Sequence, residues 1–237
     1  DPESDQTGYV SIMGTLGEHR AIDVYLGNEG LRGFLALQDS DDIPQPTLVL
    51  STPQLQLSFE EKEYLEQEDQ FIIRELEFKP HNRNEWPMFR CYRPGFAPWF
   101  LESSEISFLQ VVLEQTLAVL SNPMEREQIV TNLEEEKILV REGKKTRTGI
   151  IWTSKSRSIY PPDEELAILI NAELGDAVRH LPQSTQRVFL DLQILMNPIQ
   201  DKRGERPYFA YLLAFMDKQS ELILHFDSLT VKKDWHT

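Results

Sequence analysis

The side chains in this sequence that most resemble a metal site lie close to the C-terminus. His225 and Asp227 are two residues apart in the segment 221–229, which we predict to be a strand. Because side chains alternate along a strand, both would lie on one face, and Asp217 would lie nearby across a predicted hairpin. Imidazole and carboxylate groups are ligands for divalent metals. A solvated strand face accounts for the same residues, and we prefer that interpretation.

Other motifs for catalysis are missing from the sequence. It contains no Gly-x-Ser-x-Gly elbow, no His-Glu-x-x-His motif and no glycine-rich phosphate loop. The single cysteine, Cys91, excludes an intrachain disulfide and a multi-cysteine metal site, and it fits a reducing compartment. Cys91 alternates with Phe89 in a predicted strand, so we expect a buried structural thiol rather than a nucleophile. The sequence indicates no cofactor.

Aromatic and basic residues alternate in the tract 86–101 (WPMFRCYRPGFAPWFL), which gives the candidate contact residues Trp86, Arg90, Tyr92 and Arg93. Rings and guanidinium groups in this pattern can stack on bases or bind a protein or a small ligand. In the alternative, which we favour, the rings form the core of a hairpin and the arginines pair with an acidic segment. Hydrophobic burial favours this alternative, because it dominates the energetics of tryptophan and phenylalanine side chains.

The same tract contains a turn signal. Pro94 and Gly95 occupy the central positions that a type II turn prefers, so we predict a strand, a turn and a second strand. Within this hairpin we expect Trp99 to lie in the core and Trp86 to be the more exposed of the two.

Charge is unevenly distributed along the chain. The 237 residues include 24 lysines and arginines against 39 aspartates and glutamates, a net charge of −15, which argues against nucleic acid and anionic membranes as partners. Residues 60–78 contain eight acids and two bases, whereas residues 137–157 contain seven bases and one acid. No run of about 20 apolar residues is present, and no secretory signal opens the chain, so we expect a cytoplasmic protein.

Periodicity predicts an α+β fold made of two small units, each with antiparallel strands packed against helices. We place the first unit at 1–122, a polar connection at 123–136 and the second unit at 137–237. The strands are predicted at 9–13, 21–26, 47–51, 55–59, 138–140, 148–153, 187–196, 208–217 and 221–229.

Three helix starts are predicted from capping residues, and the third, Asp163, is expected to cap a helix that ends at Pro182. Asn28 is expected to cap a helix that runs to residue 38, and Ser103 a helix over 104–120. The second helix has one apolar stripe, formed by Ile106, Leu109, Leu113, Leu117 and Leu120. The acidic segment 60–78 is predicted to be helical. A solvated face is the preferred interpretation of its charges, and an acidic docking surface is the alternative.

Several short motifs resemble a bacterial domain family of unknown function. They are GYVSIMG at 8–14, VYLGNEGL at 24–31, and WPMFR and YRPG at 86–95 with PWF at 98–100. The C-terminal half, with RPYF at 206–209, resembles a second uncharacterised domain that often follows the first. Together the resemblances cover most of the chain, and they imply no activity.

The C-terminal strands are also similar, more distantly, to the opening strand meander of integrase-like ribonuclease H folds. In that family an aspartate of the first strand binds metal, and Asp191 matches its place. Only ten residues follow Asp227, so the later elements that carry the other carboxylates are absent, and two-metal hydrolysis needs several convergent carboxylates. The resemblance therefore implies the shape of the meander and not the activity.

Two hypotheses follow from the sequence. The leading one is a non-catalytic cytoplasmic protein that binds an unidentified protein or small ligand. The alternative is a degenerate or incomplete nucleic-acid-processing domain that binds metal through Asp191, Asp217, His225 and Asp227. The two differ in geometry, because an enzyme requires these side chains to converge in a cleft.

Overall fold

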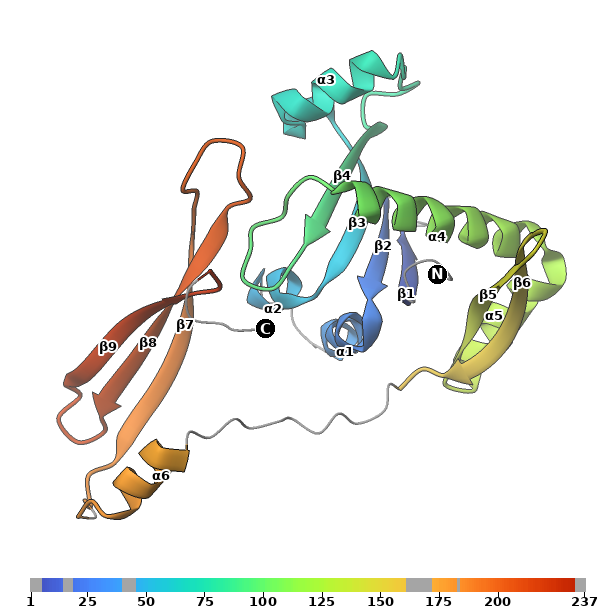
Figure 1. Ribbon diagram of the computed structural model, residues 1–237. Coiled ribbons are helices and arrows are strands. Elements are labelled where there is room, and N and C mark those ends of the chain that lie inside the picture. The colour runs from blue at the N-terminus through green and yellow to red at the C-terminus, as the bar shows by residue number, and fades with distance from the viewer. Residues whose placement is uncertain (1–5, 15–18, 40–45, 161–171, 183, 233–237) are drawn as a thin grey trace. The chain divides into compact units, whose positions relative to one another are not determined.

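The computed structural model describes residues 6–14, 19–39, 46–160, 172–182 and 184–232. The chain divides into two compact units, residues 1–161 and 162–237 (Figure 1). Small antiparallel sheets and helices make up the described residues, so the predicted α+β class is confirmed.

A four-stranded antiparallel sheet is the centre of the first unit. Its strands are β1 (Gly8–Met13), β2 (Ala21–Leu26), β3 (Gln54–Glu60) and β4 (Trp86–Tyr92), in that spatial order. The predicted β1–β2 hairpin is confirmed. On one face, Val24, Leu55 and Cys91 pack against Phe108 and Leu109 of helix α4 (Ser103–Ser121). These five residues are the apolar core that fixes the sheet.

The short helices of the first unit differ in part from the prediction. Helix α1 (Gly27–Gln38) has Leu26 rather than Asn28 as its N-cap. The predicted strand 47–51 is instead helix α2 (Pro46–Ser51), because a proline at the first position is already preset for a helical turn. The acidic segment forms a 3₁₀ turn, η1 (Lys62–Tyr64), and a helix, α3 (Gln67–Glu75), that is shorter than predicted.

Helix α4 begins with a capping box in place of the predicted Ser103 cap. Glu102 is the N-cap, and the side chain of Glu105 accepts its backbone N–H at 2.8 Å. The predicted apolar stripe is only partly buried, since Ile106 and Leu117 are exposed while Phe108 and Leu109 face the sheet. The large ring of Phe108 buries more surface than Ile106, which fixes the rotation of the helix.

The predicted connection 123–136 was wrong, because this segment forms helix α5 (Pro123–Glu134) in the first unit. It packs against a hairpin of strands β5 (Lys137–Thr146) and β6 (Gly149–Ser158), and Glu125 accepts a hydrogen bond from Arg141 at 3.0 Å. Pro123 ends α4 as predicted, but a proline is also tolerated at the first position of the next helix. The division of the chain therefore lies at 161/162 rather than at 123–136.

The second unit contains helix α6 (Ala172–Arg179) and a three-stranded antiparallel sheet. The predicted helix start at Asp163 lies outside the described residues. The strands of the sheet are β7 (Val188–Ile199), β8 (Tyr208–Asp217) and β9 (Ile223–Thr230), ordered β7-β8-β9. The predicted meander is confirmed, and each of its strands falls within a few residues of the predicted range.

Candidate interaction surface

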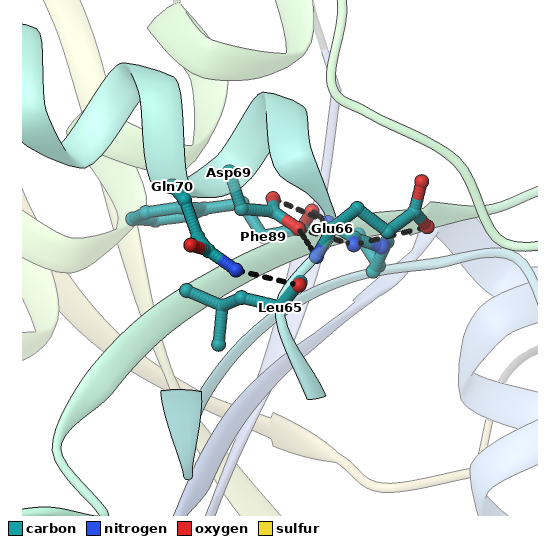
Figure 2. A network of polar contacts seen from close by, with 6 residues as sticks. Leu65, Glu66, Asp69, Gln70 and Phe89 are labelled. Carbon is teal, nitrogen blue, oxygen red and sulfur yellow. Dashed lines mark hydrogen bonds and ion pairs between the residues drawn. The ribbon is translucent and has the colours of Figure 1, made fainter. Parts of the chain in front are cut away.

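The best-defined polar network of the first unit joins helix α3 to strand β4 (Figure 2). Arg90 donates from Nη1 to Oδ1 of Asp69 at 2.9 Å and from Nη2 to Oδ2 at 2.7 Å. Both side chains are 7% exposed. Nη1 also donates to the Phe89 carbonyl at 2.8 Å, and the guanidinium lies 4.7 Å from the ring centre of Phe100. Burial by itself lowers the pKa of Arg90, but the hydrogen bonds and charge of Asp69 outweigh burial and raise it.

The same aspartate completes the start of α3. Asp69 accepts the backbone N–H of Glu66 at 3.0 Å, which forms a capping box with the Glu66 side chain. Gln70 donates to the Leu65 carbonyl at 3.2 Å (Figure 2). Within the helix itself, only Asp69 and Ile73 are buried among the described residues. Helix α3 is therefore held on the sheet largely by polar contacts.

The outer side of α3 exposes apolar side chains. Phe71 is 56% exposed, Ile72 49% and Leu76 72%, and Phe78 just beyond the helix is exposed as well. Three exposed acids flank them, Glu68, Glu75 and Glu77. A shallow, open hollow on this side is lined by Gln67, Glu68, Phe71, Ile72 and Arg74. We call the four apolar residues and the three acids the α3 patch.

Sequence reasoning did not single out the α3 patch, because it preferred a solvated charged face for residues 60–78 to an acidic docking surface. The sequence feature that indicates the patch is the presence of four large apolar residues among the acids, namely Phe71, Ile72, Leu76 and Phe78. More large apolar residues are present than one buried stripe of a nine-residue helix can use.

The predicted contact residues of the 86–101 tract are already engaged within the unit. Arg90 is buried against α3, as the favoured alternative predicted. Arg93 pairs with Glu102 at 2.9 Å and Glu105 at 2.7 Å at the start of α4, not with the acidic segment. The Tyr92 hydroxyl donates to Oε1 of Gln56 at 3.3 Å. These polar groups stabilise the fold, so they do not form an open contact site.

The two tryptophans of this tract do not divide into core and surface. Trp86 and Trp99 are both half-buried. The ring of Trp86 lies 5.2 Å from Nζ of Lys62, while Trp99 bridges to Cys91 through its backbone. The bridge between Cys91 and Trp99 stands where the second strand was predicted.

Cys91 is fully buried and its thiol donates to Oε1 of Glu105 at 2.9 Å. Burial raises the pKa of Glu105, but the hydrogen bonds from Cys91 and from the Glu102 backbone, together with Arg93, outweigh burial and lower it. The thiol is thus a structural donor within the core.

The four residues of the alternative metal set do not converge. In the β7–β8–β9 register, His225 pairs with Phe215 and Asp227 with Leu213, which puts both on one face of the sheet. Asp191 pairs with Ala214, whose side chain lies on the opposite face. Asp217 accepts hydrogen bonds from the Ser220 backbone and hydroxyl at 3.1 and 2.5 Å. Across the parts of the chain that are described, no three metal-ligating side chains gather.

Fold and contacts define an α+β protein of two small units. Residues 1–141 match the family model described as "Domain of unknown function (DUF7309)", and the chain belongs to this family. Residues 176–236 match a second model, "Domain of unknown function (DUF6930)". No curated protein and no solved structure matches the chain significantly. Among the described helices, none combines the length and the apolar character needed to cross a membrane.

Proposed function

We propose that the chain is a non-catalytic, cytoplasmic interaction protein that binds a partner protein through the α3 patch. The observation that carries the proposal is the exposed apolar side of α3, on a helix that a buried ion pair attaches to the sheet. The single cysteine, which is free and buried, supports the cytoplasmic setting.

The contacts that attach α3 to the sheet favour the interpretation that its exposed apolar side is a binding surface and not the result of a loosely attached, fraying helix. A nine-residue helix is marginal in isolation. The bidentate Arg90–Asp69 pair and the capping box fix its position without using Phe71, Ile72 or Leu76. An apolar surface that the fold holds in place, and does not itself need, is typical of a protein interaction site.

Charge defines the chemistry of the partner. Glu68, Glu75 and Glu77 flank the apolar side chains and outnumber Arg74, which lines the same hollow. The complementary surface is therefore apolar at its centre and basic at its rim. The β7–β9 sheet also exposes apolar side chains, with Phe226 on one face and Leu190 on the other. No set of like charges beside them specifies a partner, whereas the acids of the α3 patch do.

Photo-crosslinking in the native cells tests the proposal. The full chain carries p-benzoyl-phenylalanine in place of Phe71, or in place of Val130, which is 60% exposed on α5. We expect a discrete protein adduct from position 71 that is missing at position 130. The adduct should disappear when Ile72→Ser and Leu76→Ser are added.

The folding control is the urea midpoint of the Ile72→Ser, Leu76→Ser chain. It should stay close to that of the unsubstituted protein, since surface changes usually alter stability by less than about 0.5 kcal/mol. Equal adducts at positions 71 and 130, or adducts that survive the serine substitutions, would show that the α3 patch is not the contact surface.

A further inference from the structure

The β5–β6 hairpin is the second surface of the first unit that its own packing does not explain. Helix α5 covers one face of the hairpin near its base. Arg141 donates to Glu125 at 3.0 Å, and the Ser156 hydroxyl donates to Asn132 at 3.1 Å. These contacts hold the base of the hairpin against α5, and the tip of the hairpin extends past them.

Cations lie both at the base and at the tip of the hairpin. At the base, Lys155 and Arg157 both pair with Glu142. The tip, residues 143–153, carries Lys144, Lys145 and Arg147 and no acid. All three are exposed. A positive tip in a chain with a net charge of −15 is a local reversal of the surface charge.

Apolar side chains accompany the tip cations. Ile151 is 57% exposed and is paired across the hairpin with Lys144. Ile150 is 39% exposed and is paired with Lys145. Residues directly opposite each other in a hairpin share a face, so each isoleucine has a lysine beside it. The tip therefore combines exposed apolar and basic groups, which is the chemistry required of a partner for the α3 patch.

The two surfaces of one molecule lie at different ends of α4. The start of α4 lies at β4, where Glu105 contacts Cys91 and Arg93, and β4 also holds α3 through Arg90. The far end of α4 leads into α5 and the hairpin (Figure 1). Nineteen residues make α4 about 28 Å long. A contact between the two surfaces therefore requires two molecules.

We infer that the β5–β6 tip of one copy docks on the α3 patch of a second copy. The inference rests on the proposed function and names its partner. Lys144 and Ile151 share the face of the hairpin opposite to the one that carries Arg141 and its contact to α5. In the docked pair, Ile151 meets Phe71 and Ile72, and Lys144 and Arg147 lie beside Glu68, Glu75 and Glu77. Nucleic acid is the competing ligand for a basic hairpin, but the acidic remainder of the chain would repel it.

This contact is heterologous, because it joins two different surfaces. Each copy that donates its tip still has its own α3 patch open, so the assembly grows into a ring or an open filament. The charged rim makes the assembly weaken as salt rises.

Two complementary variants of the full chain test the inference by light scattering after gel filtration. The acceptor variant carries Phe71→Ser and Ile72→Ser, and the donor variant carries Lys144→Glu, Lys145→Glu and Arg147→Glu. We expect the unsubstituted chain to form oligomers that grow with concentration and shrink in high salt. Each variant alone should be monomeric. An equimolar mixture should stop at a dimer of twice 27.6 kDa, since only one productive contact remains.

The control variant carries Lys202→Glu and Arg203→Glu, two exposed cations of the second unit, and should assemble normally. A monomeric unsubstituted chain, oligomers that persist in either variant, or a mixture that stays monomeric would overturn the inference. So would a fluorescent DNA duplex that binds the unsubstituted chain but not the donor variant. If position 71 crosslinks another protein in cells while the purified chain is monomeric, the proposed function stands and only the self-association is wrong.

Discussion

Arg90 and Asp69 are 21 residues apart in sequence and form a buried, bidentate ion pair, with both nitrogen–oxygen distances below 3 Å. The pair connects an edge strand of the sheet to a helix that makes few apolar contacts. Because each member neutralises the other away from water, removing either one leaves an uncompensated buried charge.

Arg90→Ala should therefore lower the free energy of unfolding by about 3–5 kcal/mol, measured by urea denaturation. Arg93→Ala is the matched control. Its side chain is 39% exposed, and we expect a loss of about 1 kcal/mol or less. The double variant Arg90→Ala, Asp69→Ala should cost less than the sum of the two single changes. Strictly additive losses would show that the pair is not coupled.

The turn at Gly95 gives a second prediction. Gly95 has φ of 81°, and the Phe96 N–H donates to the Arg93 carbonyl at 3.0 Å, as the predicted type II turn requires. Gly95→Ala should destabilise the protein by about 1 kcal/mol, because a Cβ is strained at positive φ. Pro94→Ala, at a turn position whose backbone conformation suits alanine, serves as the comparison in the same urea experiment. An unchanged midpoint for Gly95→Ala would contradict the turn.

Asp23 provides a pH-dependent test. It is buried on β2, and burial raises its pKa from 3.8 despite a hydrogen bond from Gln56 at 2.9 Å. Because the pKa of Asp23 is higher in the folded state, protonated Asp23 stabilises the fold at pH values below the pKa of the unfolded state. This stabilisation is lost as the pH rises through the pKa of the folded state. Asp23→Asn should therefore unfold at higher urea than the unsubstituted protein at pH 7, with an amide oxygen still accepting from Gln56. The difference should vanish below pH 3.8. A variant that is less stable at pH 7 would refute this account.

Glu105 should show the opposite dependence, since its pKa is lowered in the folded state. A lowered pKa contributes stability above the unfolded value of 4.5, and this stability is lost as pH falls through the folded value. Glu105→Gln should cost about 1–3 kcal/mol at pH 7, the range for hydrogen bonds to a charged group. The gap between the two urea midpoints should narrow as the pH is lowered from 7 to 3. If the difference between the two urea midpoints does not change with pH, the charge of the Glu105 carboxylate does not account for it.

The fold class and most strands could be predicted from the sequence because their patterns are local. The β1–β2 hairpin and the C-terminal meander have clear alternation and turn signals. The segment 47–51 was mistaken for a strand because its apolar residues fit either structure over so short a length. Residues 123–136 were mistaken for a connection because polarity was given more weight than the proline start of a helix.

The candidate site was harder to predict, since it depends on pairing between distant residues. Composition indicated that arginines of the 86–101 tract would pair with acids, but not that the partner of Arg90 would be Asp69. The pairing depends on the β3–β4 register and on the residue at which α3 begins. The α3 patch in turn depends on this pairing, because the buried pair decides which side of the helix faces outward.

Asp69 accepts hydrogen bonds from both the Glu66 backbone and Arg90. One carboxylate thus closes the first turn of α3 and neutralises a side chain of β4. Unwinding that turn would take the Asp69 carboxylate away from the buried guanidinium, so we expect the helix and the end of the strand to open as one cooperative unit. Amide hydrogen exchange would show this as equal protection free energies for the α3 amides and those flanking Arg90, and Asp69→Asn would separate the two.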